Sequence, residues 1–339
     1  MDQPSVQQVF FQHIKNNLPP HLSLVDEIAE LLNISNDSAY RRIRGEKGVS
    51  FDELRTLCMH FKISLDQLLY LNSDSIIFSG SNVDSNNHTF DLWLQNVLGL
   101  LQYGNSFERR EFFFILKDMP FFYNFYQPEL AAFKFFFWMK TILQYPLFGK
   151  PVFATNEVTE NLQKTSAIIA AEYNKMPTQE IWNAESIHTS IRQIEYYKDT
   201  KMFSSAADVV HLYECLEKMI DHIEKQAELG YKFLMTGPGS PSVPKIPYKL
   251  FVNEFILGDN TVLAILNDTK VVYLNHTVLN IMWTKDTRFA EYTYQHVQNI
   301  IRKSTLISEV GEKERSRFFN TIREKLHKRK KAAENYIAD

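Results

Sequence analysis

The chain has 339 residues, a length typical of two or three domains, and 45% of its residues are hydrophobic. Its formal net charge is −3, which excludes a protein that is held on nucleic acid by positive charge over its whole surface. Any binding to nucleic acid must therefore come from a local basic patch.

Residues 1–72 are predicted to form a domain of five short helices. The first helix is expected at about Ser5 to Asn17. Ser23 can cap a second helix, in which apolar residues recur at spacings of three and four. Asn33 tolerates the left-handed conformation that ends a helix, and Ser35 can cap the helix that follows. Two helices joined by so short a turn form a helix-turn-helix.

The same stretch resembles the helix-turn-helix of the Cro and lambda-repressor class of transcriptional regulators. That class has a small residue in the first helix of the motif, a turn residue four positions later, then an apolar residue and a serine, and its second helix ends in Arg-Gly. The chain matches these positions with Ala29, Asn33, Ile34, Ser35, Arg44 and Gly45. A closing phrase at 62–69 completes the likeness, and residues 33–47 are also similar to the BetR-type branch of bacterial regulators.

The likeness has two departures. Asn33 stands where the class usually has glycine, and Arg42 stands three positions after Ala39, where the class has an apolar residue. Ile43 is apolar instead. Either the second helix is slightly rotated, so that Ile43 packs inward, or the turn is one residue longer. Two registers of this helix are therefore open.

The resemblance implies that the N-terminal half of the second helix lies in the major groove of double-stranded DNA. Asn pairs with adenine, Arg pairs with guanine, and Asp can accept a hydrogen bond from cytosine. The implied base-reading residues are Asn36, Asp37 and Arg41 or, with the helix shifted by one residue, Asp37, Ser38 and Arg42. The residues placed for phosphate contacts are Tyr40, Arg44 and Lys47.

The rest of the chain is predicted to form two further regions, each preceded by a linker. Residues 73–89 are rich in Ser, Asn and Asp, which favours a solvated linker. Residues 90–235 have helical periodicity and many aromatic side chains, which predicts a large helical domain. Residues 236–248 carry four prolines and two glycines, which break helices and central strands and predict a second linker.

Residues 249–339 are predicted to form a small α+β segment. Two strands, 249–257 and 261–266, flank a three-residue turn with glycine, which is typical of a β-hairpin. Residues 270–274 can add a third strand, and a charged helix is expected at 312–338. The predicted fold class is therefore mainly α: a five-helix helix-turn-helix domain, a larger α-helical domain, and a small C-terminal α+β segment with a β-hairpin.

Two features of this C-terminal part have open interpretations. The dense phenylalanines between residues 112 and 137 can form a helical core with a dimer interface, or they can line a pocket for a small apolar effector. A basic run can contact DNA phosphates in a dimer, or it can be a solvated helix end. The residues of this run are Lys325, Lys328, Arg329, Lys330 and Lys331.

We expect no enzyme, no cofactor and no metal site. The sequence has no G-x-S-x-G, P-loop or G-x-G-x-x-G motif, and its ten histidines match no HExxH-like pattern. Cys58 and Cys215 lie far apart, and we expect both to be small buried hydrophobes in a reducing compartment. There is no signal-peptide pattern, and charged residues interrupt the most apolar stretch, 131–148. These observations predict a cytoplasmic protein without a membrane span.

The predicted function is sequence-specific binding to double-stranded DNA by a homodimeric transcriptional regulator, whose C-terminal part dimerises or senses a signal. Two alternatives stay open. One is a protein-interaction module with a helix-turn-helix fold that does not read DNA, which Arg42 at a normally apolar position favours. The other is a ligand-sensing regulator with an aromatic pocket.

Overall fold

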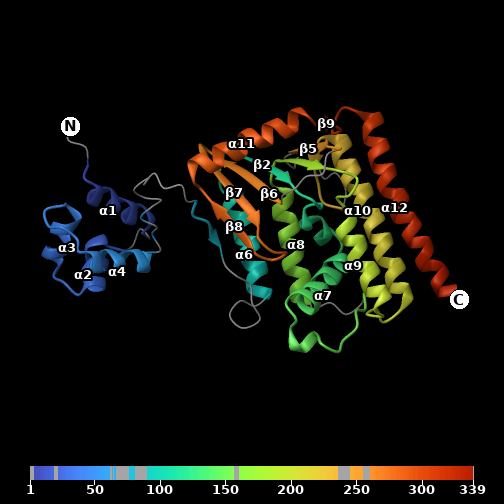
Figure 1. The fold of residues 1–339 in the computed structure, drawn as a ribbon, viewed down its shortest axis with the longest axis horizontal. Coiled ribbons are helices and arrows are strands. Elements are labelled where there is room, and N and C mark those ends of the chain that lie inside the picture. Colours follow the sequence, from blue (N-terminus) through green and yellow to red (C-terminus); the bar gives the residue numbers. More distant parts are fainter. Residues whose placement is uncertain are drawn as a thin grey trace. The chain divides into compact units, whose positions relative to one another are not determined.

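The computed structural model divides the chain into two units, Met1–Ile77 and Phe78–Asp339, named below the first and the second unit (Figure 1). The residues that the structure describes are 4–18, 22–61, 63, 65, 76–80, 90–155, 160–235, 245–254 and 260–338.

The first unit is helical. The bounds of its described helices are α1 Val6–Asn17, α2 Leu24–Leu32, α3 Asn36–Ile43 and α4 Phe51–Phe61. α2 and α3 coincide with the two helices of the predicted motif. The inward faces of the helices meet in a small apolar core, formed by Phe10, Phe11, Ile14, Ile28, Ala29, Ala39 and Leu57. The predicted closing phrase at 62–69 lies mostly outside the described residues.

Nine strands of the described residues form a mixed sheet at the centre of the second unit (Figure 1). The strands are β1 Ser79–Gly80, β2 Arg110–Ile115, β3 Thr178–Trp182, β4 Tyr231–Lys232, β5 Ile246–Val252, β6 Thr261–Leu266, β7 Thr269–Asn275, β8 Ile281–Thr284 and β9 Thr305–Leu306. Their order in the sheet is β1-β8-β7-β6-β2-β3-β5-β4, and β9 pairs with β5. β2, β3 and β5 run parallel to one another, whereas the other pairings are antiparallel.

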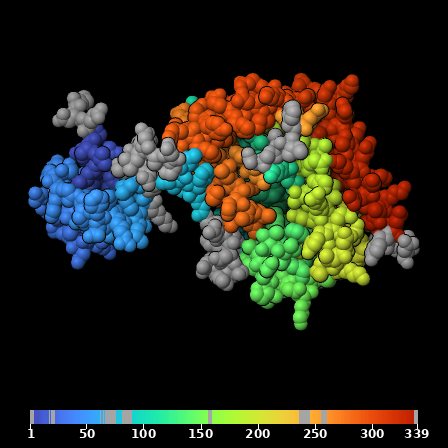
Figure 2. All heavy atoms as spheres, viewed as in Figure 1, coloured from blue at the N-terminus to red at the C-terminus, as the bar shows by residue number. Residues whose placement is uncertain are grey.

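Helices cover both faces of this sheet. The α-helices are α6 Phe90–Asn105, α7 Pro128–Phe137, α8 Glu160–Asn174, α9 His188–Asp199, α10 Ala206–Leu229, α11 Thr287–Arg302 and α12 Glu312–Ala338. Short turns of 3-10 helix are η1 Phe121–Tyr126 and η3 Pro146–Phe148, and the π-helical turn η2 Trp138–Ile142 extends α7. α12 packs along α10, and Figure 2 shows its outer side, in red, at the surface. None of the described helices is long and apolar enough to cross a membrane.

The consecutive phenylalanines of β2 contribute side chains to the cores on both faces of the sheet. Successive side chains of a strand point to opposite faces. Phe112 and Phe114 join the large core beneath α6, α8 and α10, while Phe113 and Ile115 pack with residues of α11 on the other side. A strand that is buried on both faces is apolar throughout, without the alternation that marks a half-exposed strand.

The predicted fold class, mainly α with a small hairpin, is therefore wrong. The segment 90–235, expected to be helical, contains the central strands β2 and β3, and these pair with β6 and β5 from the C-terminal segment. The two segments thus share one sheet and one core, and β5 begins within the predicted linker 236–248. The sequence predicts helix for β2 because a strand buried on both faces lacks the period of two.

The predicted hairpin is also misplaced. β5 pairs with β3 and β9, and the structure pairs β6 with β7 through the turn at Asn267 and Asp268. Asn267 has a φ of 52°, a left-handed conformation that asparagine tolerates in tight turns. Residues 258 and 259 of the turn expected there lie outside the described residues.

A buried polar cluster lies where β3 faces the large core. Glu180 is fully buried, and its Oε1 accepts hydrogen bonds from the hydroxyls of Tyr123 at 2.9 Å and Tyr173 at 2.5 Å. Its Oε2 accepts from Trp182 Nε1 at 3.1 Å. The fully buried Lys232 lies with Nζ 4.0 Å from Glu180 Oε1, and burial lowers the pKa of this lysine to about 7. The cluster is a stable part of the core, because each of these polar groups has a hydrogen-bond or ion-pair partner.

Candidate nucleic-acid interface

Capping residues fix where the second helix of the motif begins. Asn33 ends α2 with a φ of 52°, in the left-handed region. Two residues later Ser35 caps α3, and its hydroxyl accepts from the backbone N–H of Ser38 at 3.3 Å. The turn between α2 and α3 is therefore short and defined, which sets the rotation of α3.

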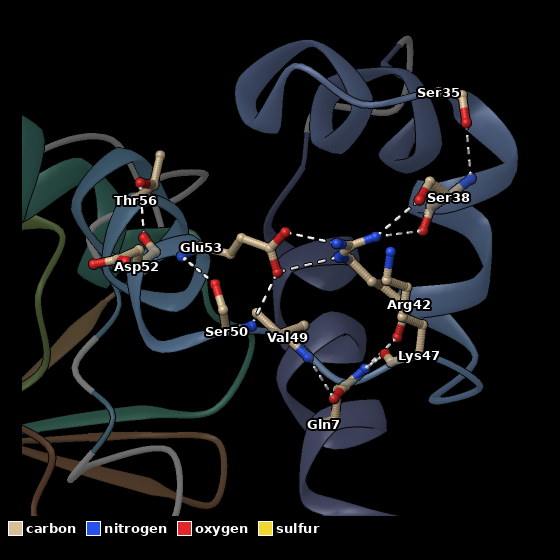
Figure 3. Close-up of polar contacts among 10 residues, drawn as sticks. All are labelled: Gln7, Ser35, Ser38, Arg42, Lys47, Val49, Ser50, Asp52, Glu53 and Thr56. Atoms are coloured by element: carbon tan, nitrogen blue, oxygen red, sulfur yellow. Dashed lines mark hydrogen bonds and ion pairs between the residues drawn. The ribbon is translucent and has the colours of Figure 1, made fainter.

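The inner face of α3 carries an arginine. Ala39 is fully buried, and Arg42 is only 5% exposed. Its guanidinium forms a two-pronged pair with Glu53 of α4, with Nη2–Oε1 at 2.6 Å and Nε–Oε2 at 3.2 Å (Figure 3). Nη1 also donates to Ser38, at 2.9 Å to the hydroxyl and 3.2 Å to the carbonyl. Arg42 thus links α3 to α4, since a buried charge requires a partner.

Glu53 serves a second role at the start of α4. Its backbone N–H donates to Ser50 Oγ at 3.2 Å, and its Oε2 accepts from the backbone N–H of Ser50 at 2.9 Å (Figure 3). This reciprocal arrangement is a capping box. The hydrogen bond from Arg42 is the main cause that lowers the pKa of Glu53 from its usual 4.5. One carboxylate therefore caps α4 and neutralises the arginine of α3.

α1 holds the loop that follows α3. The Gln7 side chain donates to the carbonyls of Arg42 and Lys47, each at 2.7 Å, and accepts from the Val49 N–H at 3.3 Å (Figure 3). Gly45 has a φ of 81° within this loop, a conformation that suits glycine. The backbone around Lys47 is therefore fixed by a side chain from another helix.

The outer face of α3 and the loop after it carry the remaining candidate residues, all exposed: Asn36, Asp37, Tyr40, Arg41, Arg44 and Lys47. The interactions of the two arginines within the protein are local and weak. The guanidinium of Arg44 lies 5.0 Å from the centre of the Tyr40 ring. Glu46 is 3.4 Å from Arg44 and 4.0 Å from Arg41, and exposed pairs of this kind contribute little to stability. Asn36 donates to Asp26 at 2.9 Å.

The residues of the two registers that the sequence leaves open differ in their surroundings. Asn36, Asp37 and Arg41 are all exposed in α3. Ser38 and Arg42 of the alternative set bond to each other, and Arg42 is turned inward to Glu53. Arg42 is therefore paired within the protein, and it fills the inward position that is apolar in the resembled class. Glu53 is not among the predicted site residues, although the Ser50-x-x-Glu53 spacing is a capping-box signal.

No protein-family model, no curated protein and no solved structure matches this chain. The function of α3 must therefore be inferred from its own side chains. A short helix with a fixed inner face and an outer face of amide, carboxylate, guanidinium and phenol groups can insert into the major groove and donate to base edges and phosphates.

The basic run of α12 faces acidic side chains of the second unit. Lys325 lies 2.7 Å from Glu185, and Lys330 lies 2.9 Å from Glu217. Arg329 is 3.5 Å from Glu195. These pairs join α12 to α9, to α10 and to the loop after β3, which favours a packing role for these three cations over phosphate contact.

The aromatic side chains of the second unit mostly fill its core. Phe112, Phe114, Phe121 and Phe122 do line an apolar cavity of about 90 Å³, together with residues of α6, β6 and β7. Sites for drug-sized ligands measure roughly 300–1,000 Å³. This cavity is therefore too small for such a ligand in the conformation described, and an apolar effector stays a prediction.

The second unit also brings together three metal-ligand side chains that the sequence analysis did not connect. Glu129, His211 and Cys215 place an oxygen, a nitrogen and a sulfur atom within 4.8 Å of one another. The expectation of no metal site overlooked the four-residue spacing of His211 and Cys215, which puts both on one face of a helix. Glu129 lies far away in sequence, and no local pattern points to it.

Proposed function

We propose that the chain is a cytoplasmic transcriptional regulator that binds double-stranded DNA through α3. The observation that supports this most is the division of α3 into two faces. Arg42 and Ala39 fix its inner face, and the exposed Asn36, Asp37 and Arg41 are left without a role in the core. Asn36 and Arg41 suit adenine and guanine, and Arg44 and Lys47 lie where they can contact phosphates.

We also propose that two copies act together. A single helix-turn-helix contacts few bases, and regulators of this kind place two copies on half-sites about 34 Å apart. Pairing two modules raises their effective concentration on DNA without any new contact. The second unit, with its large surface, is the part available for this pairing and for sensing a signal.

Binding to a selected duplex tests the base-reading assignment. Operator sequences are first selected from a random pool with the full chain, and affinity is then measured at several salt concentrations. Arg41→Ala should cost about 1–3 kcal/mol and relax the preference at one base pair per half-site. Arg44→Ala should weaken binding to all duplexes alike and reduce the salt slope by about 1. Glu46→Gln is the opposing control, because it removes a negative charge beside both arginines and should tighten binding to every duplex.

Equal behaviour of Arg41→Ala and Arg44→Ala on every sequence would contradict the assignment of Arg41 to a base.

A second candidate function is a protein-interaction module. It is favoured by two large apolar side chains of α4, Phe51 and Met59, which are 91% and 70% exposed. If the chain shows no salt-dependent binding to random duplex DNA, the result favours this second function.

A further inference from the structure

A cluster of three different metal-ligand groups bridges α7 and α10, which pack side by side. His211 and Cys215 project from one face of α10, and Glu129 comes from the first turn of α7. His211 Nε2 lies 3.6 Å from Glu129 Oε1 and 3.9 Å from Cys215 Sγ. The carboxylate and the ring nitrogen are thus too far apart for a good hydrogen bond to each other.

These separations are those expected for ligands of one common ion. Zinc binds nitrogen and oxygen at about 2.0–2.2 Å and sulfur at about 2.3 Å in a tetrahedron, which puts neighbouring ligand atoms about 3.3–3.6 Å apart. The two observed distances lie within a few tenths of an ångström of this range. All three ligand atoms lie within 4.8 Å of one another, so binding of an ion requires the side chains to move closer together.

The surroundings of the cluster also suit a cation. Cys215 is buried, whereas the side chains of His211 and Glu129 are 39% and 33% exposed, so the three groups form a site that is open on one side. Glu214 Oε2 lies 3.7 Å from Nδ1, the other ring nitrogen of His211. At this distance Glu214 adds negative charge beside the site without a hydrogen bond to His211; a carboxylate that moves closer would orient a zinc-bound histidine.

We propose that Glu129, His211 and Cys215 bind one Zn²⁺ ion, with the fourth position left to water or to an external ligand. A carboxylate, an imidazole and a thiolate form a donor set of borderline softness, which zinc prefers. Burial raises the pKa of the Cys215 thiol to about 12, so the thiol is protonated before the ion arrives. On binding, the S–H proton passes to solvent and the sulfur bonds to the metal as thiolate.

The ion would connect α7 to α10 and so fasten two helices of the large core. This inference is independent of DNA binding, because all three ligands belong to the second unit. A ligand that binds only the folded state raises the stability of that state. Zinc should therefore raise the temperature at which the second unit unfolds.

Cobalt substitution of the full chain tests the site. The reduced, metal-free protein is titrated with Co²⁺, and a thiolate-to-cobalt absorption band in the near ultraviolet is expected to saturate at one ion per chain. Zn²⁺ should displace the cobalt and remove the band. Cys215→Ser should abolish the band, whereas Cys58→Ser, the matched control at the other free cysteine, should retain it. Glu129→Gln should weaken Zn²⁺ binding by more than about tenfold.

His211→Gln provides a variant at a partly exposed position that leaves the core intact. Its second unit should unfold at the same temperature with and without Zn²⁺, whereas the unaltered chain should show an increase. Absence of the thiolate band in the unaltered chain, or its persistence in Cys215→Ser, would overturn the proposal. An equal zinc-induced stabilisation of His211→Gln and the unaltered chain would do the same.

Discussion

The two units keep charge inside the protein in different ways. In the first unit, the buried Arg42 reaches Glu53 at the edge of a small core, and the Glu53 side chain remains 21% exposed. In the second unit, the side chains of Glu180 and Lys232 are both fully buried within the large aromatic core. At the edge, an apolar side chain can replace the buried arginine, because the partly exposed Glu53 can then turn toward solvent. A pair in the interior depends on every hydrogen bond around it.

The largest expected effect comes from removing the interior acid. Glu180→Ala should lower the free energy of unfolding of the second unit by about 3–5 kcal/mol, because it leaves Lys232 and several hydrogen-bond donors unpaired. All four tryptophans of the chain follow residue 90, so their fluorescence during urea unfolding reports on the second unit alone. Gln179→Ala, at the adjacent position of β3, is the control and should cost much less. Similar losses for both variants would show that the cluster contributes nothing beyond strand packing.

A smaller effect is expected at the edge pair. Glu53→Ala should cost the first unit about 2–3 kcal/mol, because it leaves Arg42 buried without its partner and removes a helix cap. Arg42→Met should cost less than about 1.5 kcal/mol, because an apolar side chain suits this position and Glu53 can turn to solvent. Hydrogen exchange of peptides from α3 and α4 in the full chain measures both. Asp52→Ala is the neighbouring control. If Arg42→Met were the more damaging change, the comparison between edge and interior would fail.

Per pH unit, the smallest effect is a pH dependence of the second unit. Burial lowers the pKa of Lys232 to about 7, while in the unfolded chain it is near 10.5. Between these values the unfolded state binds more protons, so stability should rise with pH. From pH 7 to 9 the gain is at most about 1.4 kcal/mol per pH unit. Lys232→Met should lack this part of the slope in urea unfolding followed by tryptophan fluorescence. An unchanged slope in the variant would mean that Lys232 stays charged inside the protein.

Local signals were readable from the sequence, and pairings across the chain were not. The ends of α2 and α3 could be predicted because Ser23, Asn33 and Ser35 act on their immediate neighbours. The inward role of Arg42 could not, because it depends on Glu53 from the next helix. In the same way, His211 and Cys215 share a helix face in the sequence, but only the fold brings Glu129 to them.

The sheet explains why the fold class predicted for the second unit is wrong. Phe112, Phe113 and Phe114 are consecutive apolar residues, and such a run is compatible with a buried helix or a buried strand. These residues form a strand because they pair with β6, whose partner positions Val262, Leu263 and Ala264 lie far along the chain. A single sequence holds no local mark of that pairing.

The topology of the sheet also has a consequence for synthesis of the chain. The first unit is compact by itself, so it can fold while the rest of the chain is still being made. β2 cannot acquire its antiparallel neighbour until β6, which begins at Thr261, has left the ribosome. Until then one edge of an apolar strand is unpaired, the kind of edge that associates with other chains. Because closing long loops slows folding, the second unit is the part of the nascent protein most in need of protection from aggregation.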